Sequence, residues 1–328
     1  MKTSKSFIFI IAAAIIISCK KNETTNFGAS PSTNYTSVQD FLSKNAPAMQ
    51  TYTLNATTGG SFTSPQGTKV TIPANAFVSQ AGMPVIGIVT IQFKDLYKKS
   101  DMLLADMPTM MNNGAPLKSG GEFFIKVLSN NTVVDLATGK KITVSQPTAL
   151  TGGADSAQQA FVGRDTMVCN GVNPAGGGNC GIAAFWVPTH IDTVTEFAQN
   201  YVFNLYQFKS PVDSGTWSNS DNPSFFSAYT QTPLTIVPQD NINDYGTNVF
   251  LVFKNFASMV HVYNTVSNSF PYNYAPQGLQ CTVVALGIKG GKIYSAFVPI
   301  TISANQVVHF TLSETTTSAF TAQLQTYN

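Results

Sequence analysis

From Tyr52 onward, short runs of alternating apolar and polar residues recur along the chain, separated by Gly, Pro, Asn and Ser. In residues 69–72 every second residue is apolar, which is the period of a strand with one buried face. Pro73 ends this run, because proline has no N–H to donate to a sheet ladder. Further strands are predicted at residues 87–93, 121–128 and 141–144.

The same β pattern resumes after residue 200. Strands are predicted at residues 201–208, 233–237, 248–256, 281–288, 293–302 and 307–312. Gly290 and Gly291 stand between two of them and indicate a hairpin, and the spacing of apolar residues in 315–327 favours a short helix. Residues 151–200 are glycine-rich and weakly periodic, so a connector with one hairpin or ordered loop is expected there. The pattern predicts an all-β fold with two β-sandwich-like domains, residues 51–150 and 201–328.

Three residues are predicted to lie in the core of the first sandwich. Val70 and Ile72 are two positions apart, so on a strand they share one face. Phe77 follows the strand that Pro73 ends, and we expect its ring to fold under the same sheet.

The N-terminus has the composition of a signal peptide. Lys2 and Lys5 precede eleven uninterrupted apolar residues, 7–17, a run shorter than the ~20 residues that span a membrane. The segment then ends in Ser18 and Cys19, which resembles the bacterial lipobox. The expected organisation is a lipoprotein signal peptide over residues 1–18. An acylated Cys19 and a flexible tether follow over residues 19–50, with a short helix near residues 38–43; docking of the tether on the first domain is the alternative.

The lipobox resemblance implies a location. The thiol of Cys19 would take a diacylglycerol, a peptidase would cut before this residue, and the new amine would be acylated. Stable anchoring requires more than one acyl chain. Because no aspartate follows Cys19 directly, the resemblance implies lipid anchoring in the outer membrane. The leaflet stays open between the periplasmic and surface-facing sides.

Composition and charge exclude one class of partner. Charged residues make up 10% of the chain, with 18 basic and 16 acidic residues. Removal of Lys2 and Lys5 with the signal peptide leaves 16 of each sign. A nucleic-acid-binding protein needs a basic face, and the sequence has no dense basic cluster, so no nucleic-acid partner is expected.

Several runs carry a family resemblance. Residues 59–77 and 89–91, with Gly59, Gly60 and Ala76–Phe77 at their turns, resemble the β-sandwich domain of zona-occludens proteins, netrin receptors and ankyrins. The whole chain is similar to a family of Bacteroidota outer-membrane lipoproteins that has no established activity. The matching runs are residues 64–77, 97–104, 119–123 and 249–256. Relatives carry a cysteine where this chain has Ser220, so no role of that cysteine is expected here.

Two cysteines frame a glycine-rich loop. The exported compartment favours a disulfide between Cys169 and Cys180, and such a bridge would contribute around 2–3 kcal/mol. A zinc site would need further ligands in a familiar spacing, and none is present. Cys281 begins an apolar strand and is expected to be a small buried hydrophobe.

Loop aromatics are the candidate recognition residues. Two polar, turn-rich stretches are expected to be loops; one holds Trp217, Phe225, Phe226 and Tyr229, and the other holds Phe270, Tyr272 and Tyr274. Exposed rings on loops stack on sugars or anchor a protein partner. The alternative is that these rings fill the ends of the sandwich.

Catalytic and metal sites have little support. His190, His261 and His309 are far apart in sequence and are interpreted as ordinary sheet residues, and no catalytic motif is present. The thioethers of Met102, Met107, Met110 and Met111 leave copper open, with core packing as the alternative. The pairs Asp101/Asp106 and Asp240/Asp244 leave calcium open, although they lack the spacing of a calcium loop.

The leading functional hypothesis is a lipid-anchored cell-envelope protein, a non-catalytic binding or structural module that requires no cofactor. Its partners would be the membrane, through the lipid, and an unknown envelope protein or glycan. A carbohydrate-binding or glycan-processing lipoprotein is the first alternative. An envelope hydrolase with an unfamiliar site is the second.

Overall fold

The computed structural model describes residues 34–170, 179–208, 215–263, 266 and 268–328, and describes the backbone alone in strand residues 164–170 and 179–183. Residues Asn34–Asn328 form one compact unit. The predicted signal peptide and Cys19 lie outside the described residues.

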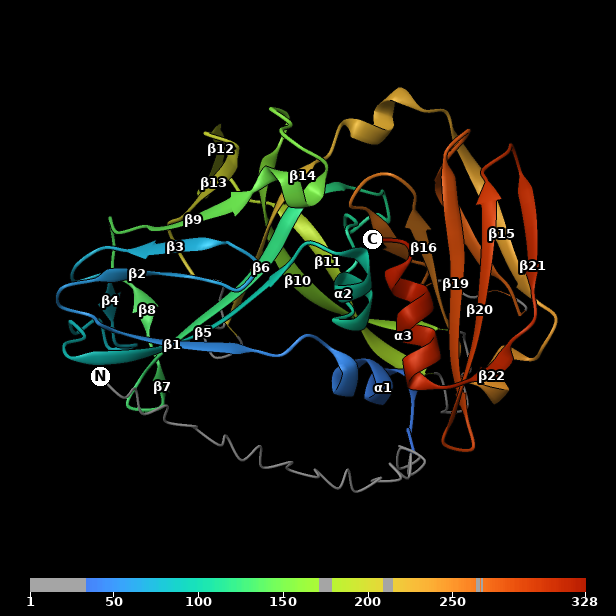
Figure 1. Cartoon of the computed structure of the whole chain (residues 1–328), viewed down its shortest axis with the longest axis horizontal. Coiled ribbons are helices and arrows are strands. Elements are labelled where there is room, and N and C mark those ends of the chain that lie inside the picture. Colours follow the sequence, from blue (N-terminus) through green and yellow to red (C-terminus); the bar gives the residue numbers. More distant parts are fainter. Residues whose placement is uncertain (1–33, 171–178, 209–214, 264–265, 267) are drawn as a thin grey trace, which may run out of the picture. The chain divides into compact units, whose positions relative to one another are not determined.

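Two antiparallel sheets form the first layer pair (Figure 1). The seven-stranded sheet has the order β1-β5-β6-β14-β10-β11, with β7 paired to β6, and the five-stranded sheet has the order β12-β13-β9-β3-β2. The strands of the first sheet are β1 (Gln50–Asn55), β5 (Ile88–Leu96), β6 (Lys118–Ser129), β7 (Thr132–Val133), β10 (Gln159–Asn170), β11 (Asn179–Pro188) and β14 (Thr216–Asn222). Those of the second are β2 (Gly60–Thr63), β3 (Lys69–Ile72), β9 (Ile142–Pro147), β12 (Thr193–Phe197) and β13 (Asn200–Leu205).

The facing sides of these two sheets share one apolar core. Val70 of β3 and Phe93 of β5 are both fully buried in it, as is Phe203 of β13. The alternation expected at residues 69–72 is observed as exposed and buried positions in β3. Phe77 lies in β4 (Phe77–Val78), a short strand that pairs with β8 (Asp135–Leu136) and places the ring in this core. The predicted burial of Val70, Ile72 and Phe77 is confirmed.

A second layer pair lies later in the chain. A three-stranded sheet has the order β18-β15-β21, in which β15 and β21 run parallel, and a five-stranded antiparallel sheet has the order β17-β16-β19-β20-β22. The strands are β15 (Gln231–Pro238), β16 (Asn248–Phe253), β17 (Met259–His261), β18 (Phe270–Pro276), β19 (Gln280–Lys289), β20 (Lys292–Thr301), β21 (Gln306–Phe310) and β22 (Ser313–Thr315). Leu234 and Val283 come from the two sheets and meet in one core. The predicted all-β, sandwich-like fold is confirmed.

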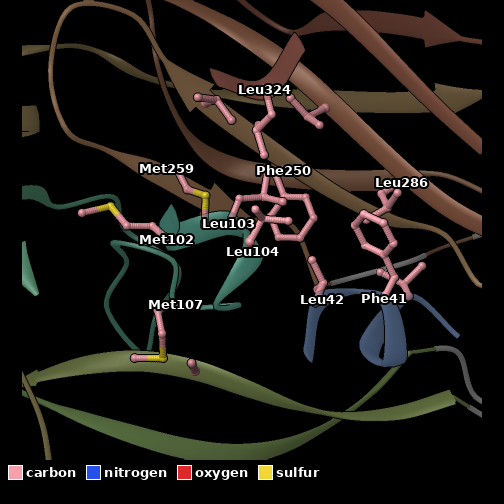
Figure 2. Packing of buried hydrophobic residues seen from close by; sticks show 14 of the residues in the cluster. Phe41, Leu42, Met102, Leu103, Leu104, Met107, Phe250, Met259, Leu286 and Leu324 are labelled. Carbon is pink, nitrogen blue, oxygen red and sulfur yellow. The ribbon is translucent and has the colours of Figure 1, made fainter. Parts of the chain in front are cut away.

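A third apolar cluster joins the helices to sheets from both layer pairs. It receives side chains from α1 (Val38–Asn45), α2 (Lys99–Leu104) and α3 (Thr317–Gln325). Figure 2 shows Phe41 and Leu42 of α1, Leu103 and Leu104 of α2, and Leu324 of α3 near Phe250 of β16. Phe161 and Trp186 of the seven-stranded sheet belong to the same cluster. The burial of apolar surface on both sides of this cluster holds residues 34–328 together.

The structure differs from the predicted organisation in three places. The short helix expected near residues 38–43 is observed as α1, but its Val38, Phe41 and Leu42 are buried rather than solvated. The backbone N–H of Tyr35 also donates to the carbonyl of Gly291 at 3.1 Å. Residues 151–200 were expected as a connector. They contain β10 and β11, which belong to the seven-stranded sheet, and β12, which belongs to the five-stranded sheet. The two aromatic stretches expected as loops contain β14 and β18. For the strands, hydrogen bonding to partners distant in sequence outweighs a turn-like local composition.

Candidate functional site

The described residues enclose a cleft of about 700 Å³. Its walls come from the end of β5 and start of α2, from residues 150–152, from the β16–β17 turn and from the adjoining ends of β19, β20 and α3. Ligand pockets of small molecules have volumes of roughly 300–1,000 Å³. The cleft is therefore of the size that takes a small organic ligand.

Buried hydrogen bonds fix the β5 side of the cleft. The Asp95 carboxylate, which is 1% exposed, accepts hydrogen bonds from the hydroxyls of Ser64 and Thr68 and from the amide of Gln66. The Thr68 hydroxyl also contacts the hydroxyl of Tyr97. Since Ser64, Gln66 and Thr68 lie in the turn between β2 and β3, this turn and the end of β5 are held as one unit.

Gly121 allows Tyr97 to pack closely. Its φ is +118°, and an added Cβ would lie 2.4 Å from the Tyr97 ring, so the backbone at this position accommodates only glycine without rearrangement. Burial and the nearby Asp95 charge raise the pKa of Tyr97 far above its ordinary value. Tyr97 therefore acts as a neutral, fixed part of the cleft wall directly before Lys98.

Lys99 connects α2 to the end of β16. Its ammonium donates a hydrogen bond to the carbonyl oxygen of Phe253 at 2.7 Å, and its side chain is buried. Burial lowers the pKa of Lys99 to about 8, because an apolar environment disfavours the charged form. Lys98 and Lys254 also line the cleft, both are exposed, and neither forms an ion pair within the described chain.

Besides its lysines, the cleft lining holds few ionisable side chains. Among the described residues that line it, none is histidine, aspartate or glutamate. Cys281 is a free, buried thiol, and burial raises its pKa to about 12. A thiol that stays protonated at neutral pH is a poor nucleophile. The cleft can therefore hold a ligand, and its one described group with a pKa near neutrality is Lys99.

The predicted recognition aromatics are mostly packed. Phe226 and Tyr272 are buried at 3% and 6% exposure, and Trp217, Phe225, Tyr229 and Tyr274 are half-buried. The Phe225 ring lies 4.9 Å from Phe256, and the Phe226 ring lies 5.3 Å from Phe253. Since Phe253 and Phe256 line the cleft, these two predicted residues support its wall from behind. Phe270 is buried as well, at 1% exposure, and neither it nor the other four candidates line the cleft.

A smaller hollow of about 320 Å³ lies beside His261. The Nδ1 atom of His261 is 3.1 Å from a carboxylate oxygen of Asp106, and both side chains are buried. The ring packs between Phe250 and Tyr263, with centroids at 4.3 and 3.9 Å. The other two histidines, His190 and His309, are exposed. The Asp106–His261 pair orients one imidazole, but the described lining of the hollow holds no serine or cysteine for it to activate.

The candidate metal ligands are separated. Met102 and Met107 pack in the cluster around the helices, while Met110 packs in the core of the second layer pair and Met111 against the helix cluster. Asp106 bonds to His261. Of the other calcium candidates, Asp240 accepts from the backbone N–H of Leu312 and Asp244 pairs with Lys289. In the described part of the chain no three His, Cys, Asp or Glu residues converge as a metal site.

Two buried acids lie on the seven-stranded sheet. Glu122 of β6 and Asp221 of β14 are both fully buried, and burial raises the pKa of each well above its ordinary value; the Asp221 charge raises that of Glu122 further. Neither carboxyl oxygen of Glu122 has a hydrogen-bond partner among the described residues. Asp221 accepts a hydrogen bond from the Asn219 amide at 2.8 Å. Sequence analysis missed this pair, because nothing in the local pattern brings residues so far apart together.

The backbone places the two candidate disulfide residues opposite each other. In the antiparallel pair β10–β11, Cys169 and Cys180 are direct register partners. The Cα atoms of such partners are about 4.5–5.5 Å apart, within the roughly 4.4–6.8 Å span of disulfides. The bridge itself stays a prediction, since the structure describes only the backbone of these residues.

The sequence did hold one signal for the cleft. Residues 64–77 and 97–104 are two of the four runs on which the lipoprotein resemblance rests, and Thr68 of the first run bonds to Asp95 and to Tyr97 of the second in this wall. No protein-family model matches the chain, and no curated protein matches it. Within the described residues, no helix has the length and apolarity needed to cross a bilayer.

Proposed function

We propose that this protein is a lipid-anchored, non-catalytic binding module of the cell envelope, and that its ligand occupies the cleft beside Tyr97. The observation that carries the binding role is the cleft itself, about 700 Å³ with walls held by buried hydrogen bonds. The chemistry of its lining favours binding over catalysis, because burial raises the pKa of its described thiol, and the ammonium of Lys99, whose pKa burial lowers to about 8, is bonded to a backbone carbonyl. The lipobox-like sequence that ends at Cys19 supports the anchor and the outer-membrane location.

The experiment for binding uses the non-acylated chain from residue 20 onward, which contains the whole compact unit Asn34–Asn328. The probe is N-phenylnaphthylamine, an uncharged fluorophore that brightens in apolar sites. Saturable binding of about one probe per chain is expected for a pocket of this size. Thr301→Trp places a large ring in the cleft and should abolish binding. Thr301 is exposed and lines the cleft, so the fold should tolerate the change.

The matched control is Val307→Trp, which adds the same ring at a position that is 54% exposed on β21 and does not line the cleft. It should bind the probe like the parent chain. Equal binding by the parent and by Thr301→Trp would show that the cleft is not the site.

The anchor has a separate test. Cys19→Ala removes the thiol that would receive the lipid, so the protein should leave the membrane fraction or persist as an unprocessed precursor. Labelling with a radioactive or alkyne-bearing fatty acid measures this directly. Lipid labelling that persists in Cys19→Ala would refute the lipobox prediction.

The glycan alternative is weaker than the sequence indicated, because Phe226 and Tyr272 are buried and Trp217, Phe225, Tyr229 and Tyr274 are half-buried against other rings or strands. Binding to a glycan array that is lost in Trp217→Ala would nonetheless favour it.

A further inference from the structure

The cleft carries an excess of positive charge. Lys98, Lys99 and Lys254 line it, and the described lining includes no acidic side chain. Asn328, the last residue of the sequence, also lines the cleft, and its terminal carboxylate offsets one of the three positive charges. Lys98 also acts on Asp101, which lies outside the lining: burial raises the pKa of Asp101, and Lys98 offsets part of that rise. In a chain with only 10% charged residues, three lysines in one cleft are a local concentration of charge.

The lysines converge because two elements are bonded together. The ammonium of Lys99 lies 2.7 Å from the carbonyl oxygen of Phe253, the residue before Lys254. The Lys254 N–H donates to the carbonyl of Gln280 at 2.9 Å, which fixes its backbone at the same place. An ammonium group has three N–H donors, and the described protein supplies one acceptor to Lys99. An anionic oxygen in the cleft would accept hydrogen bonds from the other N–H groups of Lys99 and would favour the charged form of this side chain.

Apolar surface adjoins this cationic group. Phe256, Ile300 and Tyr327 line the same cleft and are only half-buried, so each offers part of its apolar surface to a ligand. Tyr327 is held in place by stacking on Phe297, with ring centroids 5.8 Å apart. A ligand that satisfies both surfaces therefore needs an anionic group and an apolar body.

We infer that the cleft binds a small amphipathic anion, in which a carboxylate, sulfonate or phosphate ester contacts the lysines and an apolar body covers Phe256 and Ile300. The inference rests on the proposed function, because it assigns a chemical class to the ligand of the same cleft. Charge complementarity supports it, since hydrogen bonds between an ammonium group and an anionic oxygen are stronger than those between neutral groups.

The test compares two probes with one skeleton. Anilinonaphthalene sulfonate differs from N-phenylnaphthylamine by its sulfonate group, so the ratio of their affinities isolates the effect of the negative charge. The parent chain should bind the sulfonate at least about tenfold more tightly, which corresponds to ~1.4 kcal/mol. High salt should reduce this advantage, because ions screen exposed charges.

The variant is the double substitution Lys98→Gln and Lys254→Gln, at two exposed positions whose replacement leaves the core unchanged. It should weaken sulfonate binding by about five- to tenfold, as partly exposed charge pairs contribute up to about fivefold each, and should leave binding of the uncharged probe unchanged. Lys69→Gln is the control, since Lys69 is exposed on β3 and lies outside the cleft.

The outcomes separate the two proposals. Equal affinity for both probes, or equal loss of both in the double variant, overturns the anionic ligand while the cleft stays a binding site. If Thr301→Trp still binds both probes as the parent chain does, the cleft is not the binding site. A sulfonate preference that depends on Lys98 and Lys254 and disappears in Thr301→Trp supports both.

Discussion

Replacement of Glu122 by glutamine should change how the stability of this protein depends on pH. Glu122 is fully buried, both of its carboxyl oxygens lack a partner in the described chain, and the charge on Asp221 opposes its ionisation. Ionisation of Glu122 in the folded state would therefore leave a buried charge without compensation. Glutamine has the same shape and no charge, so Glu122→Gln removes the titration while the packing is retained.

The sign follows from proton binding. Because the pKa of Glu122 is raised in the folded state, the folded chain keeps a proton that the unfolded chain releases above about pH 4.3. The contribution of Glu122 to stability is fully present below the pKa that this residue has in the unfolded chain. It is lost as the pH rises toward the pKa of Glu122 in the folded chain. One such proton lowers the free energy of unfolding by about 1.4 kcal/mol per pH unit. The loss grows at this rate until the pH reaches the raised pKa of Glu122 in the folded state.

The assay is urea denaturation of the parent and of Glu122→Gln at several pH values from about 4.5 to 7.5. The two should be close in stability at the acid end, and the variant should become progressively more stable than the parent as the pH rises. Glu196→Gln is the control, because Glu196 is exposed on β12 and should change little. A difference between parent and Glu122→Gln that stays constant across this range would refute the reasoning.

Two further predictions concern the core and the cysteines. Phe77→Ala should lower the free energy of unfolding by about 3–5 kcal/mol, the cost of deleting a large aromatic side chain from a core; calorimetry measures it, and the control Phe197→Ala, at a ring that is 73% exposed, should melt like the parent. A parent-like melting temperature for Phe77→Ala would contradict its place in the core. Cys169 and Cys180 should resist alkylation in the folded, unreduced protein and react after reduction, as mass spectrometry would show. Free reaction of both thiols before reduction would rule out the bridge.

Alternation along the chain predicted those strands whose own residues carry the pattern. Strand β3 and the β19–β20 hairpin at Gly290 and Gly291 are observed where the periodicity and the glycines indicated them. The C-terminal helix is observed as α3 (Thr317–Gln325), and Phe77 is 1% exposed as expected. These features depend on residues that are close in sequence, so local periodicity and turn chemistry were enough to find them.

Long-range pairing decided the rest. Trp217 lies in β14, whose polar, serine-rich sequence resembles a turn, yet β14 is paired on both sides, with β6 and β10. Helix α1 lies in a segment that resembled a solvated tether, but its apolar face packs against Phe320 of α3. Lys99 and Phe253, which both line the cleft, are more than a hundred residues apart in the sequence. Glu122 and Asp221 are also far apart in the sequence. The local sequence determined the strands that carry their own alternation. The tertiary structure decided that β14 and β18 are strands and which strands are neighbours, because burial and charge depend on contacts that no local pattern encodes.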